Sequence, residues 1–115
     1  MMIDRDVAKR NLIAIEDYAK ANWMPRLKRH DVASVYFAKN HCGLRVYPDR
    51  LTYSSGDNTY FFGSREDPKD WYDIYDAPNA YTENLFIHWR EVKSEMESKI
   101  SELEHIRDLI ENFEV

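Results

Sequence analysis

Apolar residues recur at helical spacing in the first part of the chain, over residues 4–22. They follow one another three or four positions apart, which places them on one face of a helix. The stripe consists of Ala8, Leu12, Ile15, Ala19 and Trp23. Asp4 and Asp6 stand at the positive amino end of this helix, and Pro25 ends it. The pattern predicts an N-terminal amphipathic helix.

Short β-branched and aromatic segments alternate with turn residues between positions 32 and 62. The segments are VASVYFA, LRVYP, RLTYS and TYFFG, and they are separated by KNHCG, PD and SGDN. Such separators favour tight turns, so a small antiparallel β-meander is predicted. The first segment also fits a helical period, but its consecutive bulky residues Val35, Tyr36 and Phe37 favour a strand.

The stretch EDPKDWYDIYDAP, residues 66–78, interleaves acids with aromatic residues. Asp67 can cap a helix that begins with Pro68, and Pro78 closes the segment. The sequence therefore predicts a short acidic helix over residues 68–76. Residues 66–76 hold five acids and one lysine, which gives a local charge of −4.

The strongest pattern lies in the last third of the chain, where a seam of residues alternates at spacings of three and four. Its members are Trp89, Val92, Met96, Lys99, Leu103, Ile106, Ile110 and Phe113. All but Lys99 are apolar, which is typical of a coiled coil. The pattern predicts one long helix over residues 79–113, about 50 Å long at about 1.5 Å per residue. A compact domain of this size is only about 35 Å across, so the helix is expected to project.

The projecting seam predicts association, because exposed apolar seams usually mark interaction sites. We expect a homodimer through Trp89, Val92, Met96, Leu103, Ile106, Ile110 and Phe113. Glu102 and Arg107 could pair across a parallel two-stranded coil. The sequence leaves open whether the dimer is parallel or antiparallel. It also leaves open a hairpin between the two long helices of one chain.

Composition and charge fit a single α+β domain spanning residues 1–115. Apolar residues are 43% and aromatic residues 14% of the chain, a globular composition. The net charge of −5 argues against a dedicated duplex-DNA binder. Cys42 is the single cysteine, which excludes an intramolecular disulfide and a cysteine-rich zinc site. With no signal-peptide pattern and no apolar run of about 18 residues, we expect a cytoplasmic location and no membrane contact.

The acidic segment is a candidate protein-binding surface. Tryptophan and tyrosine can anchor an interface, and acids beside them select a basic partner. The candidate contact residues are Asp70, Trp71, Tyr72, Asp73 and Tyr75. The alternative interpretation is that the segment faces the basic turn at residues 20–30 of the same chain. No metal site is expected, because carboxylates three residues apart drift around a helix and only neighbouring pairs converge.

The predicted sheet supplies a second candidate surface. Strand alternation places Leu44, Val46, Leu51 and Tyr53 on the inner face. Arg45, Tyr47, Arg50 and Thr52 then point the other way, together with Tyr36 and Tyr60 if the register holds. Arginine and tyrosine on an open sheet can stack bases and grip phosphate. The alternative function is therefore binding of a nucleotide or single-stranded nucleic acid through Arg45, Tyr47 and Arg50.

The sequence carries no recognisable catalytic motif. Its four histidines lack metal-ligand spacing, and it has no nucleophile elbow, phosphate loop or dinucleotide fingerprint. We therefore expect no enzyme activity and no cofactor, and a metal-dependent hydrolase is the least favoured interpretation. The favoured hypothesis is a non-catalytic module that acts stoichiometrically as an adaptor or inhibitor of a larger machine. Its expected partner is a basic or nucleic-acid-binding protein.

Overall fold

The computed structural model describes residues 4–63, 72–75 and 80–113. The helices are α1 (Arg5–Asn22), the 3-10 turn η1 (Met24–Arg26), α2 (Ala80–Ile87) and α3 (Trp89–Glu111). The strands are β1 (Ala33–Phe37), β2 (Cys42–Val46), β3 (Leu51–Ser55), β4 (Asn58–Phe61) and β5 (Tyr72–Asp73). This is an α+β fold, and the predicted N-terminal helix and antiparallel meander are both confirmed.

The helix α1 begins where the sequence places its cap. The carboxylate of Asp4 accepts hydrogen bonds from the backbone N–H groups of Asp6 (2.9 Å) and Val7 (3.2 Å). These bonds satisfy donors that have no partner inside the first helical turn. The chain leaves the helix at Trp23, whose own N–H still donates to the carbonyl of Ala19.

The sheet has the strand order β1-β2-β3-β4-β5, with antiparallel pairing from β1 to β4 and parallel pairing of β5 to β4. The short acidic helix predicted for residues 68–76 is wrong for the part that the structure describes. Tyr72 and Asp73 instead form β5, and the N–H of Ile74 donates to the carbonyl of Phe61 (2.8 Å). The backbone donors and acceptors at the edge of β4 outweigh the local helical spacing. Residues 68–71 and 76 lie outside the described residues.

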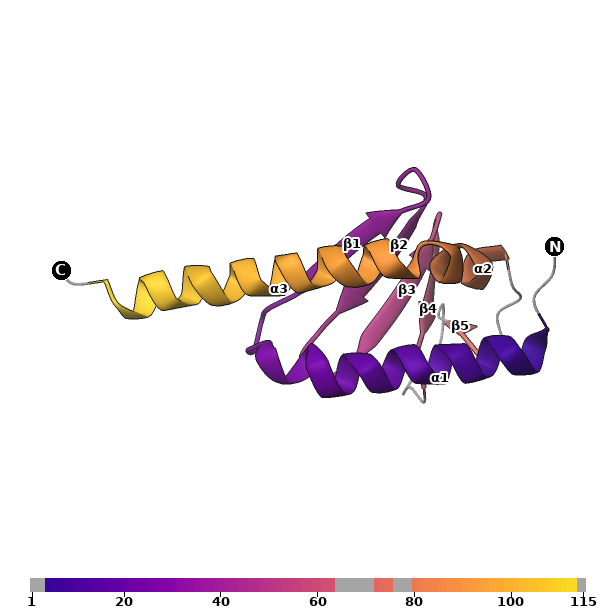
Figure 1. The fold of residues 1–115 in the computed structure, drawn as a ribbon, viewed down its shortest axis with the longest axis horizontal. Coiled ribbons are helices and arrows are strands. Elements are labelled where there is room, and N and C mark those ends of the chain that lie inside the picture. The colour runs from indigo at the N-terminus through magenta and orange to yellow at the C-terminus, as the bar shows by residue number, and fades with distance from the viewer. Residues whose placement is uncertain (1–3, 64–71, 76–79, 114–115) are drawn as a thin grey trace.

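Helices α1 and α3 lie side by side on one face of the sheet and run in the same direction (Figure 1). The ring of Tyr18 in α1 lies 6.1 Å from that of Trp89 at the start of α3. Further along, Arg26 in η1, which follows α1, donates hydrogen bonds to Glu104 in α3. A hairpin would require opposite directions, so the alternative of a hairpin between the two long helices, which the sequence left open, is not formed.

The core fills the space between the sheet and these helices. Its inner sheet residues include Leu44, Val46, Leu51 and Tyr53, each at most 1% exposed, as the alternation predicted. The helices contribute Leu12, Ile15 and Ala19 from α1 and Val92, Met96 and Ile100 from α3. Tyr60 pairs with Tyr53 in the sheet register and is also buried, so its predicted outward orientation is wrong.

The C-terminal helical region is divided at His88, and the prediction of one unbroken helix over residues 79–113 is wrong there. His88 has φ −97° and ψ 9°, outside ordinary helical geometry. Its ring packs 5.9 Å from that of Phe37, the last residue of β1. The break lets α2 bury Thr82 and Leu85, while α3 follows its own direction across the sheet. The spacing of apolar residues in the seam does not indicate such a change of direction, because the break depends on packing against a distant strand.

The domain is elongated, with principal extents of 56 × 31 × 26 Å. The end of α3 accounts for this shape, since it extends past the sheet (Figure 1). Within residues 4–63, 72–75 and 80–113, no helix combines the length and apolar character needed to cross a membrane.

Candidate functional site

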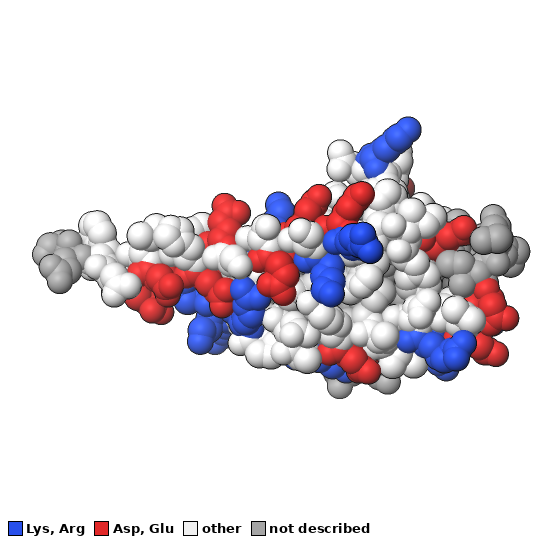
Figure 2. All heavy atoms as spheres, viewed as in Figure 1, with Lys and Arg blue, Asp and Glu red and all other residues white. Residues whose placement is uncertain are grey.

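The projecting end of α3 exposes a cluster of large apolar side chains that we call the α3 tip. The α3 tip consists of Ile106, Leu109, Ile110 and Phe113, which are 46–73% exposed. Their spacing of three, one and three residues places them on one side of the helix. Uncharged atoms form one side of the projecting end and acidic side chains line the other (Figure 2). Such a cluster of apolar residues on an otherwise charged helix is typical of an association surface.

The chain that follows α1 is tied to α3 just before the α3 tip. The Arg26 guanidinium contacts Glu97 through Nη1 (2.6 Å) and Glu104 through Nη2 (2.5 Å). Its hydrogen bonds hold the pKa of Glu104 below the usual carboxyl range. Arg107 makes a further ion pair with Asp31. Beyond these contacts the apolar side chains of Leu109, Ile110 and Phe113 are 59–73% exposed, so support for α3 ends near Arg107.

The predicted dimer seam is divided between the core and the α3 tip. Val92 and Met96 are completely buried inside their own chain, and Trp89 and Leu103 pack against that core. Ile106, Ile110 and Phe113 remain on the surface, joined by Leu109. Leu109 was not part of the predicted seam, because it lies one position off the strict spacing of three and four.

The interchain pair of Glu102 with Arg107 that a parallel coil would use has a competitor within the chain. Arg107 already pairs with Asp31 and donates to the backbone carbonyl of Arg26. An arginine held by two local acceptors is less available to a second copy. The part of the seam that can face a partner is therefore short, and Arg107 beside it is already paired within its own chain.

The described part of the acidic segment is engaged with the same chain. The Asp73 carboxylate accepts a hydrogen bond from the Tyr75 backbone N–H (2.9 Å). The Tyr75 hydroxyl donates to Glu16 on α1 (2.9 Å), and burial together with this bond raises the pKa of Tyr75. Glu16 in turn pairs with Lys20 (3.5 Å). Asp73 and Tyr75 are thus partly used for intrachain contacts.

Three further residues of the acidic segment, Asp70, Trp71 and Tyr72, were predicted to contact a partner. Asp70 and Trp71 lie outside the described residues, and Tyr72 is placed by its strand pairing with Tyr60. The suggested pairing of the segment with the basic turn at residues 20–30 is not observed for Arg26, which pairs with α3 instead.

The open face of the sheet brings together the arginine and tyrosine residues predicted there. Arg45 Nη2 lies 3.4 Å from the Tyr36 hydroxyl, which contributes most to raising the pKa of Arg45. The Arg50 guanidinium stacks 3.7 Å from the centre of the Tyr47 ring and also pairs with Asp49 (3.0 Å). Tyr36 and Arg45 thus lie on the adjacent strands β1 and β2, while Tyr47 and Arg50 lie in the turn between β2 and β3.

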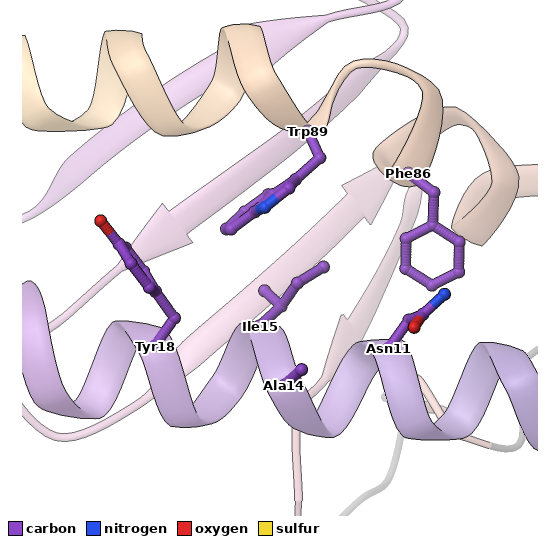
Figure 3. A pocket seen from close by; sticks show the side chains of 6 residues that line it. All are labelled: Asn11, Ala14, Ile15, Tyr18, Phe86 and Trp89. Atoms are coloured by element: carbon purple, nitrogen blue, oxygen red, sulfur yellow. The ribbon is translucent and has the colours of Figure 1, made fainter.

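An apolar groove that the sequence did not reveal lies between α1 and the junction of α2 and α3. It has a volume of about 440 Å³ and is lined by Asn11, Ala14, Ile15, Tyr18, Phe86 and Trp89. The Tyr18 and Trp89 rings face this space from opposite helices, with Phe86 at the far end (Figure 3). Because its lining is mainly apolar, the groove can accept an apolar side chain.

Metal-ligating side chains and the single cysteine are the remaining groups of chemical interest in the part of the chain that the structure describes. Over residues 4–63, 72–75 and 80–113, no three histidine, cysteine or acidic side chains converge as metal ligands would. Cys42 is a buried free thiol, with its sulfur 3.8 Å from the Ser55 hydroxyl. Comparison with protein-family models, curated proteins and solved structures found no match to this chain.

Proposed function

We propose that this chain is a non-catalytic protein-binding module that associates with a second copy of itself through the α3 tip. The observation that carries the proposal is the exposure of Ile106, Leu109, Ile110 and Phe113 on a helix end that extends beyond the domain. A second copy is the occupant best matched to this surface, because two identical apolar strips can cover each other in a symmetric pair.

The size of the α3 tip indicates a weak and concentration-dependent dimer. Full burial of one such side chain is worth about 1.5–3 kcal/mol, so the remaining exposed area is worth roughly 5 kcal/mol per copy. Two copies supply about 10 kcal/mol, against an association cost on the order of 5 kcal/mol. The difference corresponds to a dissociation constant on the order of 100 µM.

The direction of the apolar strip favours an antiparallel pair. The strip continues the face of α3 that, through Met96 and Ile100, is buried against the sheet of the same chain. A parallel partner helix would run back along this face into the space that the sheet occupies. An antiparallel partner overlaps only the α3 tip and extends away from the domain, with Ile106 opposite Ile110 of the second copy.

The dimer is tested by sedimentation velocity over a concentration series, with Ile110→Asp compared with Ile87→Asp. The two isoleucines are 71% and 68% exposed, but Ile87 lies in α2 and outside the α3 tip. We expect Ile110→Asp to stay monomeric and Ile87→Asp to associate as the unmodified chain does. The proposal fails if Ile110→Asp associates normally, or if the unmodified chain is monomeric at about 1 mM, tenfold above the expected dissociation constant.

The orientation is tested separately by oxidative cross-linking of Ile106→Cys and Ile110→Cys chains. Cys42 is buried and does not compete in this reaction. An antiparallel pair joins the two different variants when they are mixed, whereas a parallel pair joins each variant to itself. Predominant self-linking would overturn the antiparallel arrangement while leaving the dimer intact.

We further propose that the acidic segment gives the module its adaptor or inhibitor role toward a basic partner. Its support is the charge of −4 over residues 66–76 and the aromatic residues among the acids. Binding of a lysine-rich and arginine-rich peptide should weaken with salt and with Asp70→Lys plus Asp73→Lys. The control Asp17→Lys plus Asp57→Lys carries the same charge change outside the segment. It should bind the peptide more strongly than Asp70→Lys plus Asp73→Lys does. Equal binding by the two double variants would remove the segment from the interface.

The cytoplasmic location is part of the same proposal. Its support is the single cysteine, Cys42, which is buried as a free thiol and forms no disulfide within the chain. Free thiols persist in reducing compartments. A fusion of the chain to a fluorescent protein should follow the cytoplasmic fraction on cell fractionation, and recovery in the membrane pellet would contradict this placement.

A further inference from the structure

The face of the sheet that α1 and α3 leave uncovered carries a polar hollow of about 280 Å³. Its lining comes from the four adjacent strands β1 to β4 and from the turns that join β1 to β2 and β3 to β4: Tyr36, Asn40, His41, Cys42, Gly43, Arg45, Ser54, Gly56 and Thr59. Among the residues that the structure describes, no carboxylate lines it, although the chain as a whole is acidic. The hollow therefore presents a cation and several hydroxyl groups to an entering ligand.

Sheet register explains how these groups converge. Tyr36, Gly43, Ser54 and Thr59 occupy one row across four strands, since Gly43 pairs with both Tyr36 and Ser54, and Ser54 pairs with Thr59. Gly43 forms the floor of the hollow, because a Cβ there would lie 3.0 Å from the Ser54 hydroxyl and 3.1 Å from the Tyr36 ring. The absence of a side chain at Gly43 keeps this space open.

Arg45 is the charged group at this site. Its contact is with the Tyr36 phenol, at a distance of 3.4 Å, and none of the described carboxylates forms an ion pair with it. The other arginines that this fold uses structurally, Arg26 and Arg107, are both paired with acids. A partly exposed guanidinium beside hydroxyl donors is well suited to an anion with several oxygens, such as phosphate.

The rim of the hollow has an uncommon backbone. Ala38, Lys39 and Asn40 follow one another with φ of 51°, 60° and 68°. Successive non-glycine residues rarely adopt this left-handed region, which costs free energy that the fold must supply. Strain of this kind is concentrated at ligand sites, and here it positions Asn40 and His41 over the hollow.

We propose that the hollow binds the phosphate of a nucleotide, with Arg45 as the phosphate ligand and the Tyr36 ring as the platform for the base. The hollow is large enough for a phosphate and part of a sugar, and Tyr36 is 51% exposed beside it. A base can stack on this ring while its phosphate lies against Arg45, Ser54 and Thr59. This inference is independent of the α3 tip, which projects from a different element.

The first test is a titration of the whole chain with adenosine monophosphate and, separately, inorganic phosphate, followed by amide NMR shifts. We expect saturable shifts at Gly43, Ser54 and Thr59 with adenosine monophosphate, at a dissociation constant on the order of 1 mM. Inorganic phosphate should bind about tenfold more weakly, because it lacks the stacked base. Absence of saturable shifts with adenosine monophosphate at low salt would overturn the proposal.

Variants separate the two parts of the site. Arg45→Gln should weaken binding of both probes about tenfold. Tyr36→Ala should weaken adenosine monophosphate about tenfold and leave inorganic phosphate unchanged. Arg10→Gln removes an exposed arginine on α1 and should have no effect. Arg45→Lys keeps the charge and the aliphatic stem, so it tests the phosphate contact even if Arg45→Gln unfolds. Arg45→Lys loses the planar fork that can contact two phosphate oxygens, so it should also weaken both probes, though less than Arg45→Gln. Unchanged binding by folded Arg45→Gln, or by Arg45→Lys where the glutamine variant does not fold, would refute the role of Arg45.

A final comparison distinguishes free nucleotides from single-stranded nucleic acid as the source of the phosphate. An eight-nucleotide oligothymidylate that binds at least about tenfold more tightly than thymidine monophosphate, with stronger salt dependence, would identify the single strand. Equal affinities for the oligothymidylate and for thymidine monophosphate, counted per binding site, would identify the free nucleotide as the ligand. Both results require that Arg45→Gln weakens the interaction, and binding that survives this substitution would place it elsewhere.

Discussion

Replacement of Arg26 by glutamine gives the sharpest test of how α3 is held. The Arg26 side chain contacts Glu97 at 2.6 Å, Glu104 at 2.5 Å and the Ser101 hydroxyl at 3.2 Å. These bonds join the turn after α1 to the last supported part of α3. Glutamine can preserve some packing and one hydrogen bond, but it removes the charge and the planar fork that reaches two carboxylates.

The expected loss follows from geometry and exposure. Arg26, Glu97 and Glu104 side chains are 29%, 39% and 37% exposed, so solvent screens the pairs considerably. An exposed ion pair contributes up to about 1 kcal/mol, whereas a hydrogen bond to a charged group contributes about 1.5–3 kcal/mol when it is well buried. For two short, partly screened contacts we expect about 1.5 kcal/mol. In a chain of this length this lowers Tm by roughly 6 °C.

The assay is urea unfolding of the unmodified chain, Arg26→Gln, Glu104→Gln and the double variant. The coupling energy between Arg26 and Glu104 from this cycle should be about 1 kcal/mol. It should shrink in about 1 M salt, where the Debye length falls to about 3 Å.

The same cycle should depend on pH with a defined sign. Arg26 lowers the pKa of Glu104 in the folded chain, so the folded state binds fewer protons at this group than the unfolded state. The contribution is present above the unfolded-state pKa of about 4.3 and is lost as pH falls through the folded-state value. A coupling energy below about 0.3 kcal/mol at neutral pH, or one unchanged by both salt and acid, would refute this reasoning.

Three further outcomes are expected. Met96→Ala, in the buried core, should lower the free energy of unfolding by about 2–5 kcal/mol. Ile110→Ala, in the α3 tip, should change it by less than about 0.5 kcal/mol in dilute monomer. Similar losses for the two variants in urea unfolding would contradict the division of the seam. Cys42 should react with a thiol reagent only on unfolding, and rapid labelling of folded chain would contradict its burial. Burial raises the pKa of Tyr53 and Tyr75, so their contribution to stability should be present below about pH 10 and decline above it. An ultraviolet titration in which all tyrosines of the folded chain ionise together near pH 10 would contradict this expectation.

Helices and strands whose formation depends on residues close together in the sequence were predictable. The stripe at Leu12, Ile15 and Ala19 gave α1, and the turn residues around Pro48 and Gly56 separated the strands. Alternation along the strands also predicts that Arg45, Tyr47 and Arg50 share one face of the sheet. What alternation did not reveal is that Arg45 lacks an acidic partner among the described residues, because partners come from segments distant in sequence.

Errors arose where distant parts of the chain compete for the same residues. Tyr72 and Asp73 carry a helical spacing, yet they pair with the edge of β4, which lies more than ten residues earlier in the chain. The seam from Trp89 to Phe113 is regular, yet its first half is covered by α1 and the sheet. A periodic pattern states which face is apolar, but it does not state what covers that face.

The sequence by itself determined the α+β composition, the strand meander, the inner face of the sheet and the presence of an apolar seam near the end of the chain. These follow from local periodicity and turn chemistry, which act over a few residues. The tertiary structure alone decided that α1 and α3 run in the same direction, that the helical region divides at His88, and that the seam is free only at the α3 tip. Burial depends on which distant surfaces meet, so only the assembled fold separates core from binding surface.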